Sequence, residues 1–248
     1  MNIIAIIPAR SGSKGIKDKN ISDVAGFPLL AYSIAAAKLS SKISSVVVST
    51  DSDKYAAIAQ SYGAEVPFLR PSVISGDTAL DIEYLDFTLR KLNETRNDKI
   101  EMAVLLRPTT PIRDPRDIDN AIDMLIERED ATAVVSVKET SECPYKWVKM
   151  DDRGIIKSPF NELSTDDVNL PRQTFPKLYI PDGYVDVLRT EEILFNGNVY
   201  GENAYAWINH HEFVDIDVAQ DLKKVRESKL ENSSVYKYLK DNYGGIKC

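Results

Sequence analysis

Basic residues gather in a glycine-containing segment that directly follows the first apolar run of the chain. The run Ile3–Ile7 is followed by Pro8-Ala9-Arg10-Ser11-Gly12-Ser13-Lys14-Gly15-Ile16-Lys17-Asp18-Lys19-Asn20. Backbone N–H groups in a loop after a strand can surround phosphate oxygens, and Arg10, Lys14 and Lys19 can neutralise their charge. This N-terminal loop, residues 8–20, therefore indicates a site for a polyphosphate such as a nucleoside triphosphate.

The N-terminal loop fits neither of two common phosphate-binding templates. It lacks the G-x-x-x-x-G-K-[ST] spacing of a P-loop and the full G-x-G-x-x-G fingerprint of dinucleotide-binding proteins. A nicotinamide-dependent oxidoreductase is therefore disfavoured. An ordinary strand–helix connection with solvated lysines stays open as the alternative to a phosphate site.

Two carboxylates near the C-terminus form a second candidate site. Glu212–Ile216 reads as a strand, so the side chains of Asp215 and Asp217 would point to one face. Paired carboxylate oxygens suit Mg²⁺. Alternatively, Asp217 caps the helix that is predicted to begin at Val218.

Two further segments follow predicted strands and could border a ligand. Ser49-Thr50-Asp51 ends a strand, and Asp51 could bind a ribose hydroxyl, although a role in capping the next helix is favoured. Arg107-Pro108-Thr109-Thr110-Pro111-Ile112-Arg113 follows another strand, and its prolines predict a rigid extended loop. Such a loop could form one wall of a binding site.

Alternating strand and helix patterns would place these segments at one edge of a sheet. Short β-branched runs predict buried parallel strands at Ile3–Ile7, Val46–Val48, Ala103–Leu106 and Ala133–Val137. Helical spacing occupies the intervals at Leu29–Ala37, Tyr55–Tyr62, Ile82–Leu92 and Ile118–Ile126. The predicted fold is therefore α/β, with a doubly wound, mostly parallel sheet and ligands at the carboxyl ends of its strands.

The pattern changes near Cys143. Tyr145–Lys157 reads as a hairpin, and the polar stretch after it has no long helix, so we interpret residues 143–176 as an excursion from the sheet. Strands at Tyr184–Leu188 and Tyr205–Ile208 follow, and then a helix from Val218 to Leu230. We assign residues 1–230 to one domain and residues 231–248 to a polar tail whose end could fray.

Composition excludes several classes of protein. The 248 residues carry a net charge of -7, which argues against a nucleic-acid surface, and 43% of them are hydrophobic, as in a single α/β domain. No apolar run approaches the roughly 18 residues that span a bilayer, so we expect a cytoplasmic protein without membrane contact. The two cysteines, Cys143 and Cys248, indicate neither a disulfide framework nor a thiolate zinc site.

Seven motifs, in order over roughly residues 2–228, resemble the cytidylyltransferases that activate nonulosonic acids, that is, CMP-sialic acid synthetases (N-acylneuraminate cytidylyltransferases) and their legionaminic or pseudaminic acid relatives. The motifs are Ile7–Gly15 with Lys19-Asn20, Ser49-Thr50-Asp51, Leu69-Arg70-Pro71, Asp77-Thr78, Arg107–Pro111, Pro171-Arg172-Gln173 and Asp215-Ile216-Asp217. The resemblance implies a nucleotide-diphospho-sugar transferase type of fold that binds CTP.

The resemblance also implies roles for individual residues. The loop residues that would bind the triphosphate are Arg10, Gly12, Ser13, Lys14 and Lys19, and those near the cytidine are Asn20, Arg70, Thr78, Ala79 and Asp81. Asp215 and Asp217 would bind Mg²⁺. In the implied reaction the anomeric hydroxyl of the sugar acid attacks the α-phosphorus of CTP, Arg10 and Lys14 stabilise the departing pyrophosphate, and Asp217 helps to deprotonate the hydroxyl.

The resemblance further implies a homodimer. The excursion would act as a dimerisation arm whose Lys146 and Arg172 lie near the sugar. This chain departs from the sialic acid pattern at Arg107, Asp182 and Asp81, where related enzymes carry Gln, Asn and Ser, so we expect it to prefer a nonulosonic acid other than N-acetylneuraminic acid. Pairing of Arg107 with Asp182 is the simpler alternative.

Two other functions stay open. The chain could be a sugar cytidylyltransferase of the CMP-KDO synthetase type, which shares the fold and the two carboxylates. It could also be a nucleotide-sugar-binding protein without turnover.

Overall fold

A six-stranded sheet forms the centre of the molecule. The computed structural model describes residues 1–211, 214–228 and 230–246. The strand order is β10-β6-β9-β5-β1-β4. The strands are β1 (Ile3–Pro8), β4 (Ser45–Ser49), β5 (Met102–Leu105), β6 (Ala133–Glu139), β9 (Tyr179–Arg189) and β10 (Ala204–Ile208). A small separate hairpin joins β2 (Asp23–Val24) to β3 (Phe27–Pro28).

The strand directions make the sheet mostly parallel. β1 is parallel to both β4 and β5, and β10 is parallel to β6. Within the described sheet, β9 is antiparallel to both of its neighbours, β5 and β6. The chain leaves the sheet along β6 and returns along β9, so the two strands must run in opposite directions. The four predicted parallel strands are confirmed as β1, β4, β5 and β6.

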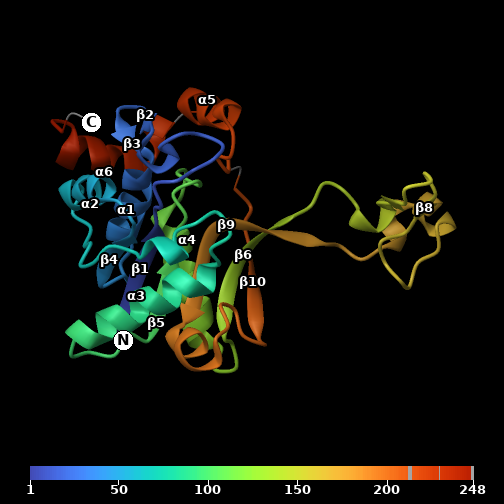
Figure 1. The fold of residues 1–248 in the computed structure, drawn as a ribbon, viewed down its shortest axis with the longest axis horizontal. Helices are drawn as coiled ribbons and strands as arrows, with labels where there is room; N and C mark the ends of the chain where they lie inside the picture. Colours follow the sequence, from blue (N-terminus) through green and yellow to red (C-terminus); the bar gives the residue numbers. More distant parts are fainter. Residues whose placement is uncertain (212–213, 229, 247–248) are drawn as a thin grey trace.

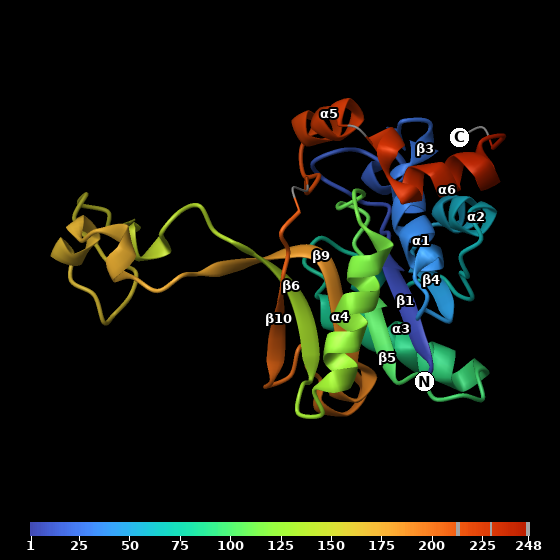
Figure 2. The ribbon, with the colours of Figure 1, turned by 180° about the vertical axis from the view of Figure 1, so that it is seen from behind.

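Helices cover both faces of the sheet (Figures 1 and 2). One face carries α1 (Leu29–Leu39), α2 (Asp53–Ser61) and α4 (Pro115–Glu127), and the other carries α3 (Asp81–Thr95). Two more helices follow the last strand, α5 (Ala219–Glu227) and α6 (Ser234–Tyr243). Shorter helical turns are η1 (Lys19–Ile21), η2 (Ser72–Ile74), η3 (Pro144–Lys146), η4 (Asp166–Asn169), η5 (Arg172–Thr174), η6 (Glu192–Asn196) and η7 (Leu230–Asn232).

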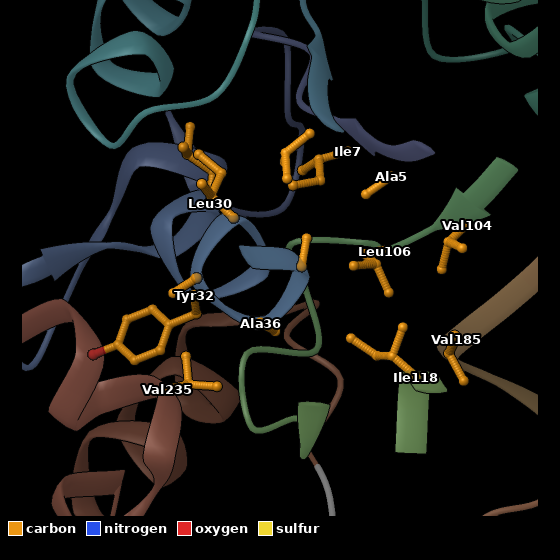
Figure 3. Close-up of a cluster of buried hydrophobic side chains, with 14 of the residues drawn as sticks. Ala5, Ile7, Leu30, Tyr32, Ala36, Val104, Leu106, Ile118, Val185 and Val235 are labelled. Carbon is orange, nitrogen blue, oxygen red and sulfur yellow. The ribbon is translucent and has the colours of Figure 1, made fainter. Parts of the chain in front are cut away.

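Alternate side chains of β1 enter two different cores. Ala5 and Ile7 pack in the cluster that contains α1 and α4, and Figure 3 shows them in this cluster with Leu30 and Ile118. Ile4 and Ile6 pack in the cluster on the α3 side. Burial on both faces explains why the predicted strands are continuous apolar runs. The strands, packed on both faces, therefore support the loops at their carboxyl ends.

The arm, residues 143–176, extends away from the sheet beyond the ends of β6 and β9 (Figure 1). It contains the predicted hairpin, formed by β7 (Lys149–Met150) and β8 (Ile156–Lys157). Stacking of Tyr145 with Phe175 at 5.3 Å between ring centroids helps to hold the arm together. Trp147 and Met150 are 53% and 72% exposed, so this small unit leaves apolar surface in contact with water.

The structure differs from the sequence prediction in two places near the C-terminus. The segment after residue 230, predicted to be a polar tail, contains α6, which packs against α1 and buries Val235 and Leu239. The strand predicted at 212–216 is wrong as far as it can be compared. Residues 212 and 213 lie outside the described residues, and residues 214–217 form no strand. Ile216 instead donates its backbone N–H to Thr109 O at 2.9 Å. Its backbone partner is therefore the loop that follows β5, not a strand of the sheet.

The described helices include no segment that is long and apolar enough to cross a membrane.

Candidate active site

A cavity of about 370 Å³ opens where β1 and β5 end. Parallel α/β sheets bind ligands at this edge because the loops that leave the strands converge there. Predicted site residues in its wall are Arg10, Ser13, Lys14, Lys19, Asn20, Arg70, Ala79, Asp81, Arg107 and Asp217. Pro108 and Thr109 also line it, which confirms that the loop after β5 forms a wall. Tertiary structure thus joins segments that are up to two hundred residues apart.

Hydrogen bonds from distant residues hold the N-terminal loop in place. Asp51, which follows β4, accepts hydrogen bonds from the backbone N–H and the hydroxyl of Ser11 at 2.8 and 2.9 Å. Asn20 is buried and donates to Arg10 O at 3.0 Å. The favoured assignment of Asp51 as a helix cap is wrong, because Ser52 caps α2 by accepting from Tyr55 N. Asp51 holds the loop instead.

The N-terminal loop lies directly against the segment that contains the two carboxylates. A Cβ added at Gly15 would lie 2.5 Å from Asp217 O, so a side chain there would displace the backbone. Lys19 Nζ donates to Ile216 O at 2.8 Å and lies 3.3 Å from Asp217 Oδ1. Lys19 therefore ties the carboxylate segment to the loop.

Arg10 and Lys14 both pair with Asp77. Arg10 Nη1 lies 2.7 Å from Asp77 Oδ1, and Lys14 Nζ lies 2.8 Å from Asp77 Oδ2. Hydrogen bonds from Lys14 and Arg10 lower the pKa of the Asp77 carboxyl, so it is ionised at neutral pH. Asp77 belongs to one of the seven motifs that carry the family resemblance, but the sequence predicted no role for it.

Asp215 and Asp217 lie in an irregular segment rather than on one face of a strand. Asp217 lines the cavity, and Val218, not Asp217, is the N-cap of α5. Partial burial raises the pKa of Asp215, a hydrogen bond with Thr109 opposes this rise, and the Asp217 charge adds to it. The two carboxylates are therefore close enough to interact.

The carboxylate oxygens fit a magnesium ion that is also bound by a substrate. In residues 1–211, 214–228 and 230–246, no group of three or more His, Cys, Asp or Glu side chains could hold a metal ion by itself. Mg²⁺ commonly takes one or two carboxylates together with water and substrate phosphates. Asp215 and Asp217 match that smaller donor set.

Arg70 forms a buried wall of the cavity. It is 5% exposed, donates from Nη2 to Ser49 O at 2.8 Å, and lies 4.4 Å above the centroid of the Tyr84 ring. Burial lowers the pKa of its guanidinium, yet arginine remains charged at any pH near neutrality. Arg70 thus supplies a fixed donor for a polar ligand group.

Arg107 connects the cavity to the interior of the sheet. Its Nη2 lies 2.8 Å from Asp81 Oδ2, and its Nη1 lies 2.7 Å from Asp186 Oδ2. Asp186 is 1% exposed, and its Oδ1 has no hydrogen-bond partner within the described residues. Burial raises the pKa of Asp186, against the attraction of Arg107.

Asp182 does not lie in the cavity wall and does not pair with Arg107. Its carboxylate is buried and accepts hydrogen bonds from the Ser136 hydroxyl, Asn209 Nδ2 and Tyr184 N. The alternative that Asp182 pairs with Arg107 is therefore wrong, because Arg107 pairs with Asp81 and Asp186. Contact of Asp182 with a sugar stays a prediction. Buried donors, invisible in the local sequence, already surround this carboxylate.

Five other predicted residues also lie outside the cavity wall. Gly12 and Thr78 belong to segments that line it, but they are not part of the lining, and neither is Asp215. Lys146 and Arg172 lie in the arm, where Lys146 donates to Leu170 O and Arg172 donates to Ser141 O and Thr140 O. Within one chain the arm extends away from the sheet (Figure 2).

The fold and the site define an α/β nucleotidyltransferase, with a cationic loop after the first strand and carboxylates opposite it. A sequence profile described as Cytidylyltransferase matches residues 4–240. The chain belongs to this family and is a CTP-dependent cytidylyltransferase. The predicted resemblance is confirmed.

Characterised relatives are similar over most of the chain. The N-acylneuraminate cytidylyltransferase of Escherichia coli is 34% identical over 224 residues, which are 89% of this chain and 50% of the relative, so the chain spans about half of that protein. The CMP-N,N'-diacetyllegionaminic acid synthase of Legionella pneumophila is 34% identical over 223 residues, 89% of this chain and 93% of the relative.

Solved structures support the fold. A CMP:2-keto-3-deoxy-manno-octonic acid synthetase complexed with CTP has a TM-score of 0.65 at 16% identity, covering 92% of this chain and 98% of that chain. The predicted α/β class with a mostly parallel sheet is thereby confirmed.

Proposed function

We propose that this protein transfers CMP from CTP to the anomeric hydroxyl of a nonulosonic acid and releases pyrophosphate. The observation that carries the proposal is that Arg10, Lys14 and Asp217 line the same cavity. The names of the relatives support a nonulosonic acid as the acceptor.

The residues of the cavity can stabilise the charge that develops in this reaction. Attack on the α-phosphorus gathers negative charge on phosphoryl oxygens and on the leaving pyrophosphate. Arg10 and Lys14 would neutralise the pyrophosphate, and Arg70 would bind the cytidine together with Asn20 and the backbone near Ala79. Catalysis then consists mainly of positioning and electrostatic stabilisation.

Asp215 and Asp217 would hold Mg²⁺. When bound, this ion neutralises phosphoryl oxygens and lowers the pKa of a coordinated hydroxyl. Asp217 would accept the proton of the attacking hydroxyl, since it lies in the cavity wall and its side chain is 75% exposed.

The arm would complete the site from a second subunit. Lys146 and Arg172 are cations that lie outside the cavity of their own chain, and a sugar acid carries a carboxylate that they could bind. A homodimer in the cytoplasm, with no nucleic-acid or membrane partner, is the assembly we propose. The arm, residues 143–176, would remain part of the catalytic domain, which includes α6 through its packing against α1.

A pyrophosphate-release assay tests the proposal. The protein is incubated with Mg²⁺, CTP and, in separate samples, N-acetylneuraminic acid, a legionaminic acid, a pseudaminic acid and the eight-carbon acid KDO. Release of pyrophosphate with a nine-carbon acid is expected, and UTP in place of CTP serves as the control. Release with KDO alone would identify the KDO type of enzyme, and binding without release would indicate a non-catalytic protein.

A further inference from the structure

The carboxylate of Asp77 bridges Arg10 and Lys14, two of the cations of the N-terminal loop. Each of its oxygens contacts one cation, at 2.7 Å from Arg10 Nη1 and 2.8 Å from Lys14 Nζ. Phosphate oxygens make the same kind of charge-assisted contact with Arg and Lys. Asp77 is therefore bound to the groups that the proposed function assigns to the triphosphate.

The contacts of Asp77 can be broken without disturbing the fold. Its side chain is 33% exposed, and that of Lys14 is 78% exposed. Ion pairs between exposed groups are weak, so a ligand with more negative charge can replace the carboxylate. Asp77 follows Gly76, in the turn between η2 and α3, and both residues line the cavity.

Lys19 differs from these two cations. Its side chain is 14% exposed, and its ammonium group is held by Ile216 O and Asp217 Oδ1. Lys19 thus keeps the carboxylate segment in place, whereas Arg10 and Lys14 are held by a side chain that can move away. The loop divides its cations between a structural and a ligand-binding role.

We propose that Asp77 competes with the nucleotide phosphates for Arg10 and Lys14 and so sets both the affinity for CTP and the preference among cytidine nucleotides. The proposal rests on the proposed function. When a ligand must first release a competing contact, its apparent affinity falls with the fraction of molecules in which the cations are free. This competition lowers the affinity most for CTP and pyrophosphate, whose phosphates would reach both Arg10 and Lys14. It lowers the affinity for CMP less.

Calorimetric titration of Asp77→Asn tests this proposal without turnover. In the absence of divalent metal, we expect the Kd for CTP and for pyrophosphate to fall by about threefold to tenfold, because two exposed ion pairs no longer oppose binding. The Kd for CMP should change less. Asp77→Glu, which keeps the charge, should bind CTP as the wild type does.

Asp86→Asn is the matched control. Asp86 lies in α3 and pairs with Arg90 at 2.8 Å, outside the cavity, so the variant makes the same change in net charge at a distance. Its Kd for CTP should equal that of the wild type. In a Lys14→Ala background, the gain from Asp77→Asn should shrink, since one of the two contested cations is missing.

Two results would overturn the proposal. Unchanged or weaker CTP binding by a folded Asp77→Asn variant would show that Asp77 does not compete, and an equal gain for CMP and CTP would show a general charge effect. Absence of CTP binding to the wild type even with Mg²⁺ present would instead contradict the proposed function, so the two failures are distinguishable.

Discussion

Arg107 both lines the cavity and stabilises the fold through a buried ion pair. Its guanidinium spans Asp81 at the cavity and Asp186, which is 1% exposed, in the sheet. Removing one partner of a buried ion pair leaves an uncompensated charge and typically costs about 3–5 kcal/mol. A substitution at Arg107 therefore alters stability as well as the cavity.

We expect Arg107→Gln to lower the free energy of unfolding by about 3 kcal/mol, and Arg107→Gln with Asp186→Asn to recover most of that loss, because no buried charge then lacks a partner. Urea denaturation of both variants measures the difference. Equal stability of the single and double variants would contradict a buried pair.

The double variant Arg107→Gln/Asp186→Asn also tests sugar preference. The wild type should use N-acetylneuraminic acid less well than a legionaminic acid, and glutamine, which can both donate and accept, should shift the ratio of kcat/KM toward N-acetylneuraminic acid by about tenfold. Competition kinetics with the two acids measure the ratio. A ratio unchanged from the wild type would place Arg107 away from the sugar.

The two carboxylates should differ from other acidic residues in their response to metal. Asp215→Asn and Asp217→Asn should each weaken binding of Mn²⁺, used as a paramagnetic substitute for Mg²⁺, in the presence of CTP, because a neutral amide attracts a hard cation less strongly. Electron paramagnetic resonance measures free Mn²⁺, and EDTA should abolish turnover. Wild-type Mn²⁺ binding by both variants would exclude the metal role.

At the scale of elements, the N-terminal loop and the segment 214–217 behave as one unit. The loop is tied to β4 through Asp51 and to Asp217 through Lys19. Gly15 permits this contact because it has no side chain to meet Asp217 O. The position of Asp215 and Asp217 thus depends on Gly15, which lies in the N-terminal loop.

Gly15→Ala should reduce kcat by about 100-fold, because a Cβ would lie 2.5 Å from Asp217 O and a displacement of about 1 Å at a catalytic group can have this effect. Steady-state kinetics measure the loss. Gly245→Ala is the control, since a Cβ there meets no atom within 4 Å. Wild-type kcat in Gly15→Ala would show that the carboxylate segment can move without consequence.

At the scale of the whole molecule, the arm leaves apolar residues exposed. Trp147, Met150 and Ile180, at the base of the arm or within it, are 53%, 72% and 58% exposed. Large exposed apolar side chains that cluster on a projecting element are typical of interaction surfaces. A second copy of the chain, related by a twofold axis, is the partner we propose.

Sedimentation should show a dimer, twice the chain mass of 27.8 kDa. Arg172→Ala and Asp217→Asn should each have little activity alone, whereas a refolded mixture should regain activity. In a mixed dimer, an intact arm from one chain would meet an intact cavity from the other. An active monomer, or a mixture no more active than its components, would contradict this arrangement.

Much of the fold could be predicted because its signals are local. The four parallel strands are continuous apolar runs, and the turn residues around the arm hairpin indicate it without reference to the rest of the chain. Helix α6 escaped prediction because its buried residues, Val235 and Leu239, are few and lie among polar ones. Its stability comes from α1, which lies far away in the sequence.

The sequence by itself determined the class of protein, the four parallel strands with the helices between them, and the loops that carry the cations and carboxylates. Tertiary structure decided which of these side chains are free to bind a ligand and which already bind another part of the protein. Asp182 is enclosed by buried donors, Asp51 holds Ser11, and Asp77 meets Arg10 from 67 residues away. Periodicity reports which side of an element is buried, but a hydrogen-bond partner that is distant in sequence is chosen by packing, so only the folded chain reveals it.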